Sequence, residues 1–392
     1  MGTVEGASCR HWLGGGGRAL ATAALVGALA ACAPPSGRAA GAPAVLYVAS
    51  SVDGTVARLD GVTGRSLGPP LPAGPLPWQL AGGPDGSLLA LSAAPNAAWP
   101  LTHLGRAGDG WAARPVALPG PAREARLAGD GGRYAVVVDR GSGTPPAAAT
   151  DPGAGSPGCR LTLVDVPAGT IAAATTTAAC GPHDQLTGLA LAGGAGDPVA
   201  YLALWRPAAP GDAGAAGDAN RVVAVRARTG ATLARFRTGG VPVLLALGSA
   251  PGGLGDRVYG VERPVGAEDA PPPPPHARLF GLDPTTLALE SERPLDFVPV
   301  RLVVAADGTT AYALHDHSLT RVDLAGGGAG GAGQRLARLP ELGLALAVAG
   351  DRVYVTSASG RDVWAFRRRD GRLVATLPVG PIPADLLLSP AE

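Results

Sequence analysis

The sequence predicts an all-β fold, a seven-bladed β-propeller in which each blade contains four antiparallel strands. Three observations predict it: short apolar runs recur 42 to 67 residues apart, similar turn motifs repeat between them, and glycine and proline are abundant. Recurrence at this length is typical of propellers and similar arrays. A closed array can absorb about 350 residues into one body, so we expect a single folded domain.

The apolar runs are marked by the six tyrosines, each of which lies in a segment typical of a buried strand. The runs are VLYVAS at Tyr47, RYAVVV at Tyr134, AYLALW at Tyr201, RVYGVE at Tyr259, AYALHD at Tyr312 and RVYVTS at Tyr354. A further copy, SLLALS at 87–92, has Leu89 in place of tyrosine. We therefore count seven repeating units.

Turn motifs supply the other strands of each unit. The strand after the tyrosine strand often ends in Asp before a Gly or Thr turn, as in ARLDGVTG (57–64), LVDVPAG (163–169), GLDPTT (281–286) and RVDLAG (321–326). Asp suits that place because its carboxylate accepts hydrogen bonds from backbone N–H groups two residues on. A third strand then ends in Gly-x-x-Pro, as in GPLP, GGVP and GPIP, and a fourth precedes turns such as PDG and ADG. Each unit thus has four strands.

Composition agrees with this architecture. Gly 60 and Pro 39 make up about a quarter of the chain, which suits many tight turns and leaves little room for long helices. Apolar residues at 46% and charged residues at 16% exclude a disordered chain. The 32 basic residues, all arginine, nearly balance the 31 acidic ones, so the charge pattern of a nucleic-acid-binding protein is missing.

The N-terminus has the layout of an export signal. Arg10, His11 and Arg18 precede an apolar run at 19–31, which is shorter than the roughly 20 residues that a membrane-spanning helix needs. The closing LAAC resembles the lipobox of bacterial lipoproteins, in which the cysteine is acylated and becomes the first residue. We therefore expect a lipoprotein signal peptide at 1–31, lipidation of Cys32, a flexible tether at 32–43 and the propeller at 44–392. The alternative is an ordinary secretory peptide with an incidental cysteine.

The remaining cysteines fit an oxidising compartment. Cys159 and Cys180 flank a predicted hairpin with its turn at 167–169, so they are expected to face each other and form a disulfide. Two separate thiols are the alternative.

The segment RVYVTSASGRDVWAFRRRDGRLVATLPVGPIPADLLLSP at 352–390 resembles a repeat of the YVTN family of β-propellers. The resemblance is also close at 44–92, and weaker in the middle, where insertions at 141–158, 207–219 and 263–276 follow tyrosine strands. It implies a propeller that is exported or surface-associated, and it implies no particular chemistry, because many members have none assigned.

By analogy with this fold, ligands are expected at one mouth of the central channel, where loops lead into the innermost strands. The residues predicted there are Trp78, Arg123, Glu124, His183, Asp184, Gln185, Asp296, Arg301, Glu341 and Asp385. His183 and Asp184 are the first choice, because the expected disulfide would hold them rigidly. Polar loop tips without a function are the alternative.

Motifs for chemistry are few. His315 and His317 have ligand-like spacing, but they lie at a turn where polar residues are expected anyway, so no metal, cofactor or catalytic residue is assigned. No haem, zinc-protease, serine-hydrolase or nucleotide-binding motif occurs.

The sequence therefore predicts a monomeric, non-enzymatic binding platform for a protein, glycan or small ligand, lipid-anchored outside the cytoplasm on the bacterial cell membrane. The alternative is an extracytoplasmic propeller enzyme, such as a lactone hydrolase, a lyase or a quinoprotein-like oxidoreductase, with His183, Asp184 and Glu341 as acid or base groups.

Overall fold

The structure is a computed structural model, and it describes residues 44–93, 101–119, 122–129, 132–141, 158–181, 183–193, 197–207, 220–249, 256–264, 277–325 and 333–390. Within these ranges the chain forms 28 β-strands and no α-helix. None of the described segments is a helix long and apolar enough to cross a membrane. The expected signal peptide, Cys32 and the tether lie outside the described residues.

The strands form seven sheets of four strands each, which are the blades. We number the blades along the chain and list the strands of each blade from the innermost to the outermost. Blade 1 contains β28 (Pro383–Pro390), β1 (Ala44–Ser50), β2 (Thr55–Asp60) and β3 (Leu71–Pro72). Blade 2 contains β4 (Pro77–Gly82), β5 (Leu88–Ser92), β6 (Leu101–Ala107) and β7 (Gly110–Pro115). Blade 3 contains β8 (Ala122–Gly129), β9 (Tyr134–Gly141), β10 (Cys159–Asp165) and β11 (Thr170–Thr177). Blade 4 contains β12 (Gln185–Ala192), β13 (Val199–Trp205), β14 (Arg221–Arg226) and β15 (Thr232–Arg237).

The remaining three blades follow the same order. Blade 5 contains β16 (Val241–Ser249), β17 (Asp256–Arg263), β18 (Ala277–Leu282) and β19 (Leu289–Leu295). Blade 6 contains β20 (Arg301–Val304), β21 (Thr310–His315), β22 (Ser318–Asp323) and β23 (Gln334–Arg338). Blade 7 contains β24 (Gly343–Ala349), β25 (Arg352–Ser357), β26 (Asp362–Arg367) and β27 (Leu373–Pro378).

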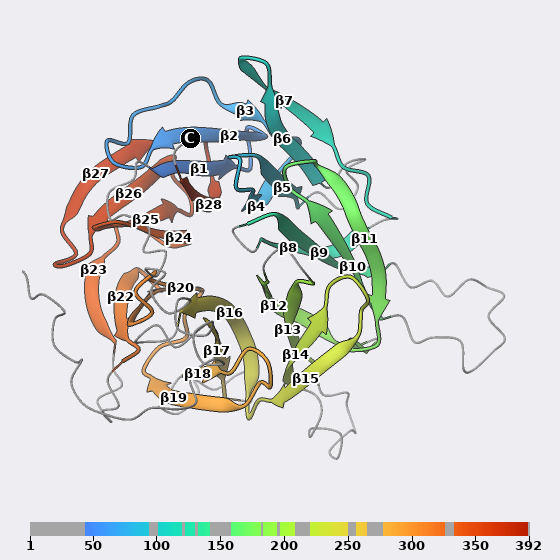
Figure 1. Ribbon diagram of the computed structural model, residues 1–392. Helices are drawn as coiled ribbons and strands as arrows, with labels where there is room; N and C mark the ends of the chain where they lie inside the picture. The colour runs from blue at the N-terminus through green and yellow to red at the C-terminus, as the bar shows by residue number, and fades with distance from the viewer. Residues whose placement is uncertain are drawn as a thin grey trace, which may run out of the picture. The chain divides into compact units, whose positions relative to one another are not determined.

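The blades close into a ring with the innermost strands around its centre (Figure 1). The innermost strands contact one another in the order β4, β8, β12, β16, β20, β24 and β28, and β28 returns to β4. The last strand, β28, pairs antiparallel with the first, β1, so blade 1 is built from both ends of the propeller. The predicted seven-bladed, all-β architecture with terminal-strand closure is confirmed.

The core lies between blades rather than within them. Leu46, Val48 and Leu59 of blade 1 pack against Tyr354 and Val363 of blade 7, and comparable clusters join the other neighbouring blades. Each sheet therefore buries both faces, which is why its inner three strands are almost continuously apolar.

The tyrosines that mark the units connect neighbouring blades through their hydroxyl groups. Tyr354 donates to the carbonyl of Gly61 in the β2–β3 turn, and Tyr201 donates to the carbonyl of Pro284 in the β18–β19 turn at 2.8 Å. Tyr134 and Tyr312 instead accept hydrogen bonds from Arg228 and Arg368, in the corresponding turns of the next blades. The recurrent tyrosine is thus a structural link between blades.

The turn role predicted for Asp is confirmed. Asp60 accepts a hydrogen bond from the N–H of Val62 at 3.0 Å, and Asp283 accepts one from Thr285 at the same distance. Each carboxylate also accepts a bond from a threonine N–H one residue further on.

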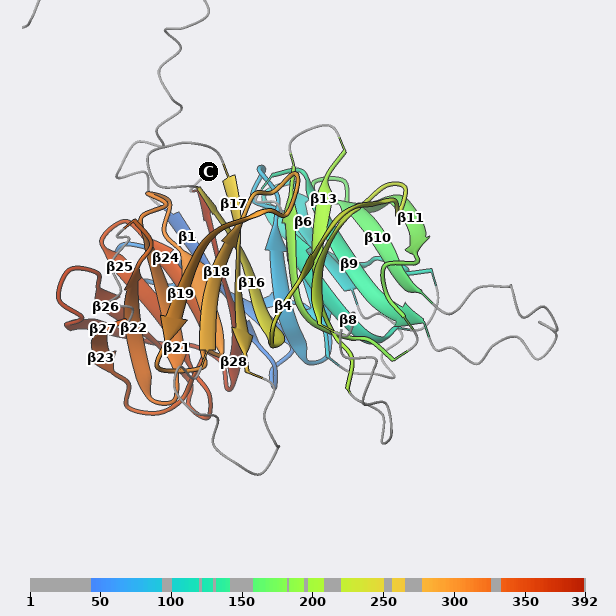
Figure 2. The same ribbon diagram turned by 90° about the horizontal axis from the view of Figure 1, so that it is seen from below.

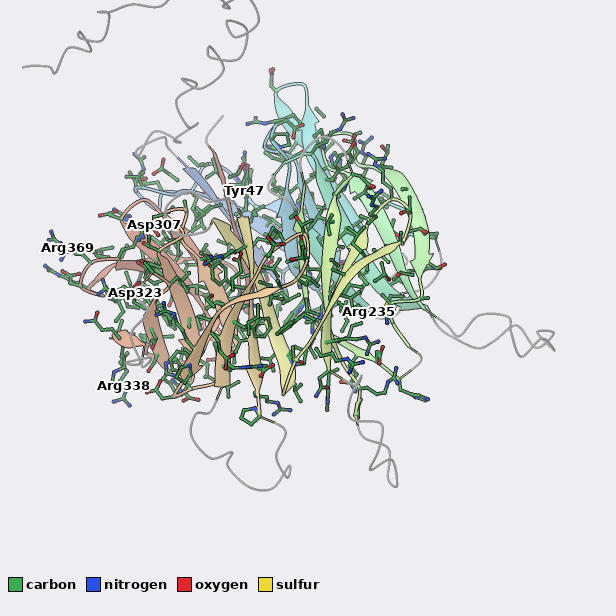
Figure 3. The ribbon with its side chains drawn as sticks, turned by 60° about the horizontal axis from the view of Figure 1, so that its bottom comes forward. Tyr47, Arg235, Asp307, Asp323, Arg338 and Arg369 are labelled. Atoms are coloured by element: carbon green, nitrogen blue, oxygen red, sulfur yellow. A yellow bond between two sulfur atoms is a disulfide. The ribbon has the colours of Figure 1, made fainter. Side chains whose placement is uncertain are left out.

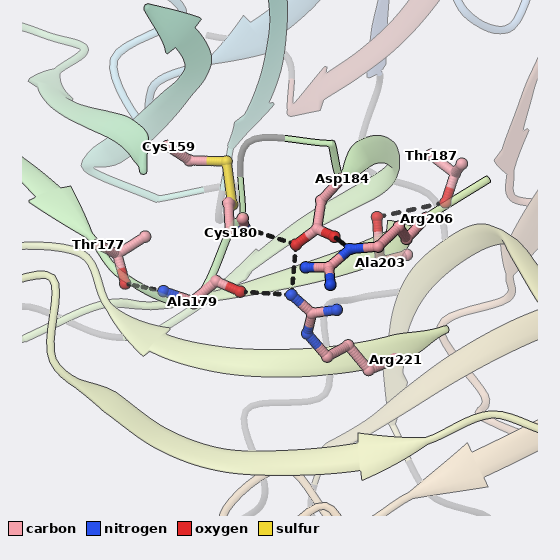
Figure 4. The surroundings of a disulfide bond; sticks show 10 residues. Cys159, Thr177, Ala179, Cys180, Asp184, Thr187, Ala203, Arg206 and Arg221 are labelled. Atoms are coloured by element: carbon pink, nitrogen blue, oxygen red, sulfur yellow. Dashed lines mark hydrogen bonds and ion pairs between the residues drawn. A yellow bond between two sulfur atoms is a disulfide. The ribbon is translucent and has the colours of Figure 1, made fainter. Parts of the chain in front are cut away.

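The disulfide between Cys159 and Cys180 is confirmed, with Cα atoms 5.4 Å apart (Figure 4). The two cysteines do not face each other across the hairpin, however, because the residue opposite Cys159 is Thr177. Strand β11 ends at Thr177, and Cys180 lies in the connection that leads to blade 4. The bridge therefore joins the third strand of blade 3 to the connection between two blades.

Candidate functional site

The two faces of the ring carry different turns (Figure 2). We call the end at which the innermost strands begin the mouth face, and the opposite end the far face. The mouth face carries the turns that lead from the outermost strand of one blade to the innermost strand of the next, as the sequence predicts. It also carries the loops between the second and third strands, because consecutive strands are antiparallel.

Two of the mouth-face turns contain a residue in the left-handed region of backbone conformation. Leu76 in GPLP has φ 48° and Ile382 in GPIP has φ 49°. This region is unfavourable for a branched side chain and costs about 1–3 kcal/mol where it is held. Both side chains are exposed, 45% for Leu76 and 36% for Ile382. The strained backbone thus directs apolar side chains into solvent.

These two residues lie in adjoining turns that also expose Val52 and Trp78, and we call the four side chains the apolar sector: Val52, Leu76, Trp78 and Ile382. Ser51 holds it together, because its N–H donates to the carbonyl of Ile382 at 3.1 Å and its hydroxyl donates to the carbonyl of Pro77 at 3.0 Å. Val52 is 59% exposed and Trp78 is 39% exposed. Elsewhere on this face, Val300 and Leu342 occupy two further turns and are also exposed. Apart from Trp78, sequence reasoning missed these residues.

The innermost strands are irregular at their first residues. A register shift occurs in β4, β8, β12, β16, β24 and β28, each close to the mouth. Such bulges re-aim side chains and are frequent next to binding sites. Trp78 and Ala384 are the extra residues of the shifts in β4 and β28.

Directly after these shifts, polar side chains reach from one innermost strand to the next. Asp385 Oδ2 accepts a hydrogen bond from the N–H of Leu80, and Gln79 Oε1 accepts one from the N–H of Leu127, both at 2.8 Å. Arg126 Nε donates to the carbonyl of Leu186 at 2.8 Å. The polar groups at the start of the innermost strands therefore fix the spacing of the blades.

Two predicted residues, Arg301 and Asp385, act on each other at the mouth. Part of the surface of Asp385 stays open, but protein atoms surround its carboxylate, and this burial raises its pKa. The positive charge of Arg301 and hydrogen bonds from the N–H groups of Leu80 and Leu386 oppose that shift and only partly offset it. Asp385 is thus a titratable group whose charged form is disfavoured, which is typical of functional sites.

Asp184 serves a structural network beside the disulfide (Figure 4). Its buried carboxylate pairs with Arg206 at 2.8 Å and with Arg221, and it accepts the N–H of Gly181 at 2.6 Å. Burial alone would raise its pKa, but the Gly181 N–H and the two guanidinium groups more than offset this and lower it. Asp184 therefore braces the connection between blades 3 and 4.

Glu341 also has a full set of partners. It accepts hydrogen bonds from the hydroxyls of Ser357 and Ser359 and, at 3.0 Å, from the N–H of Gly360, and the Ser357 hydroxyl contributes most to lowering its pKa. Asp184, Glu341 and Asp385 thus lie in three separate hydrogen-bond networks.

The other predicted residues are less constrained. His183, Gln185 and Asp296 are exposed. Arg123 and Glu124 lie in the bulged part of β8, and their side chains are outside the described residues. The ligand-binding role of the predicted set stays a prediction.

His315 and His317 do not share a strand face, because β21 ends at His315 and β22 begins at Ser318. The His315 ring stacks on Phe297 at 3.9 Å, and Nε2 lies 2.7 Å from the hydroxyl of Thr320. Burial lowers its pKa. Among the described residues, no group of three or more His, Cys, Asp or Glu side chains is placed to hold a metal ion.

Comparisons with known proteins identify the fold. No protein-family model matches the chain. No curated protein matches it in sequence either. Among solved structures, a 6-phosphogluconolactonase candidate from Bacteroides uniformis matches with a TM-score of 0.57 and 13% identity, over 89% of this chain and 100% of that one. A functionally unknown protein from Desulfotomaculum acetoxidans matches with a TM-score of 0.55 and 12% identity, over 89% of this chain and 99% of that one. Dihydro-heme d1 dehydrogenase NirN matches with a TM-score of 0.53 and 16% identity, over 88% of this chain and 74% of that one. At these identities the likeness shows a shared β-propeller fold.

Proposed function

We propose that this chain is a membrane-anchored lipoprotein of the YVTN type, held outside the cytoplasm by Cys32, whose propeller binds a protein partner on its mouth face without catalysing a reaction. The anchor and the location are supported by the N-terminal layout and the LAAC motif. The binding role is supported by the apolar sector, and the polar side chains at the start of the innermost strands supply groups for specificity.

The observation that carries the proposal is the exposure of Val52, Leu76, Trp78 and Ile382 on one sector of the mouth face. Exposed apolar side chains that gather on adjoining turns beside polar groups are typical of interaction surfaces. The left-handed backbone at Leu76 and Ile382 reinforces this, because a strained conformation that only exposes apolar atoms lowers the stability of the isolated protein. A protein partner that covers these side chains offsets the lost stability by burying apolar surface. Aromatic residues such as Trp78 are favoured at the centres of such interfaces.

The enzyme alternative expects His183, Asp184 and Glu341 as acid or base groups. Asp184 and Glu341 belong to separate hydrogen-bond networks, and His183 is exposed. Asp385, whose burial raises its pKa, belongs to a third network. An enzyme that uses these carboxylates as acid and base must bring them within hydrogen-bond reach of one substrate. The contacts therefore favour binding.

Site-specific photo-crosslinking in cells tests the proposal. A photo-reactive residue replaces Trp78 in the full chain, and a matched control places it at Leu233, which is exposed to a similar extent on the outermost strand of blade 4. We expect one discrete adduct from position 78 that is lost when Leu76→Ser and Ile382→Ser are added, and none from position 233. Equal labelling at both positions, or an adduct that survives the serine changes, would reject the mouth face as the binding surface.

A further inference from the structure

On the far face, a pocket of about 600 Å³ lies between blades 6 and 7. It is lined from blade 6 by Thr310, Tyr312 and Arg321, and from blade 7 by Gly350, Asp351, Arg367, Arg368 and Arg369. Its volume falls within the range of about 300–1,000 Å³ that is usual for small-molecule sites. Four arginines and one carboxylate make it strongly basic, and it lies at the opposite end of the blades from the apolar sector.

Arg368 forms a rigid wall of this pocket. Its Nε donates to the Tyr312 hydroxyl at 3.0 Å, Nη1 donates to the Gly350 carbonyl at 3.0 Å, and Nη2 donates to Asp307 at 3.1 Å. The guanidinium also lies 5.5 Å from the centre of the Tyr312 ring. These contacts tie the two blades together and fix the shape of the pocket, so Arg368 has a structural role.

The carboxylates around the pocket already have arginine partners. Asp307 pairs with Arg368 at 3.1 Å, and Asp370 pairs with Arg367 at 2.9 Å. Asp351 lies 3.9 Å from Arg352. Five arginines at the pocket and its edge, namely Arg321, Arg352, Arg367, Arg368 and Arg369, face these three carboxylates, so two guanidinium groups are left without a carboxylate of their own.

Those two groups are Arg321 and Arg369, on opposite walls. Among the described contacts, Arg321 donates only to the side chain of Gln334, at 2.5 Å, and pairs with no carboxylate. Arg369 is 74% exposed, and its nearest carboxylate, Asp370 at 3.7 Å, is shared with Arg367. Figure 3 shows Arg369 and Asp307 at neighbouring blades, on the opposite side of the ring from Arg235. Both guanidinium groups keep donors for a ligand, since each has five N–H bonds.

The repeat itself provides an internal comparison for this turn. In the β26–β27 turn, the carbonyl of Arg367 accepts a hydrogen bond from the N–H of Gly371, four residues further on. The carbonyls of Asp60 and Asp283 accept the equivalent bond in the turns of blades 1 and 5. Arg367 therefore occupies the position that an Asp occupies in those two turns. There a backbone carbonyl, of Gly61 or Pro284, is sufficient to bind the tyrosine of the preceding blade. Where an arginine makes this link instead, one is enough, since Arg228 of blade 4 binds Tyr134 and Arg368 binds Tyr312 here, so Arg369 is not needed for it.

We propose that the pocket binds a phosphate-bearing ligand through Arg321 and Arg369. A carboxylate offers two oxygens in a plane, which one guanidinium can satisfy, whereas a phosphate offers oxygens in several directions and can join guanidinium groups on two walls. The volume exceeds that of a bare phosphate, so the group belongs to a larger molecule. Either a soluble phosphate ester or a phospholipid headgroup has this chemistry. The site is independent of the binding surface on the mouth face.

Calorimetric titration of the purified full chain with glycerol 3-phosphate, at constant ionic strength, tests the site. We expect saturable binding that Arg321→Gln and Arg369→Gln each weaken about tenfold or more, since a hydrogen bond to a charged group is lost. Arg235→Gln, at an exposed arginine on β15, is the matched control and is expected to bind as the original chain does. Binding that is not saturable, or that all three variants weaken alike, would overturn the proposal.

Two further measurements complete the test. The thermal midpoint of Arg369→Gln is expected to be unchanged, because this exposed side chain makes no hydrogen bond among the described contacts, so a weakened affinity cannot come from unfolding. Sedimentation with phosphatidylglycerol vesicles uses the Cys32→Ala chain, to remove any acyl anchor. Loss of vesicle binding with Arg321→Gln and Arg369→Gln assigns the phosphate to a headgroup. Binding of glycerol 3-phosphate without vesicle binding assigns it to a soluble ester.

Discussion

The carboxylate of Asp385 accepts a hydrogen bond from the N–H of Leu80 at 2.8 Å, although 305 positions separate the two residues. The bond joins the innermost strands of blades 1 and 2, and the strand that carries Asp385 also pairs along its length with β1. Strand β28 thus closes the ring in two directions, within its own sheet and toward the next blade.

Deletion of residues 381–392 is therefore expected to destabilise the whole propeller in one cooperative step. The deletion exposes one edge of β1 and removes the strand that packs between β24 and β4. A deletion of residues 391–392 alone is the control, because it leaves β28 intact. Thermal unfolding followed by circular dichroism measures both; an unchanged midpoint for the longer deletion would contradict ring closure by β28.

Asp385→Asn is expected to raise the thermal midpoint at pH 7. The pKa of Asp385 is raised in the folded state, so the unfolded chain ionises first and stability falls as pH rises through the interval between the two pKa values. Below the unfolded value, near 3.9, the carboxyl is neutral in both states and the penalty disappears. Asn is neutral at every pH and keeps an acceptor for Leu80, so its advantage should vanish near pH 3.

The control for this comparison is Asp385→Ala, which loses the acceptor and is expected to be less stable at both pH values. A lower midpoint for Asp385→Asn than for the original chain at pH 7 would mean that attraction to Arg301 exceeds the cost of burial.

Tyr354→Phe is expected to lower the free energy of unfolding by about 1–3 kcal/mol, because the buried carbonyl of Gly61 loses its donor. The comparison is Tyr259→Phe. The Tyr259 hydroxyl is buried without a hydrogen-bond partner among the described contacts, although Arg257 lies near it. Urea denaturation of both variants measures the difference; equal losses would show that the link between blades does not depend on the hydroxyl.

The fold could be predicted from the sequence because each blade repeats the same local chemistry. Tyrosine strands, Asp turns and Gly-x-x-Pro turns recur in register with the sheets. The repeat is less regular in blade 3. Tyr134 is the first residue of β9, and Val136, two residues later, pairs with Ala128 of the innermost strand β8. The insertions after the tyrosine strands fall in segments that the structure leaves undescribed.

The candidate site was less predictable, because exposure and partners depend on contacts between blades. The sequence around Asp184 does not indicate that Arg206 and Arg221 form ion pairs with its carboxylate. Likewise, Leu76 and Ile382 look like core residues until their left-handed backbone is known. Three consecutive arginines at 367–369 were a visible signal, but their pocket requires blade 6 beside them.

Cys32→Ala is expected to release the chain from membranes. The acylated cysteine is the proposed anchor, and two or more acyl chains hold a protein on a bilayer stably where one does not. Cell fractionation and immunoblotting measure the distribution, with Cys9→Ala as the control, since Cys9 lies within the proposed signal peptide. The anchor assignment fails if the Cys32 variant stays with the membranes to the same extent.

Removal of the disulfide is expected to destabilise the junction between blades 3 and 4. Cys159 and Cys180 are 21 positions apart, and closing a loop of about that length stabilises a protein by roughly 3 kcal/mol. Because Asp184 and its two arginines brace the same connection, a Cys159→Ala/Cys180→Ala chain should unfold at lower urea concentration while keeping its strand content. Intact mass after alkylation without reduction checks the bond itself, since two alkylated thiols at these positions would exclude it.

Arg206→Gln should lower the free energy of unfolding more in the double-alanine chain than in the original chain, because the connection has then lost its other constraint. Equal losses in the two chains would show that the bridge and the ion pairs act independently.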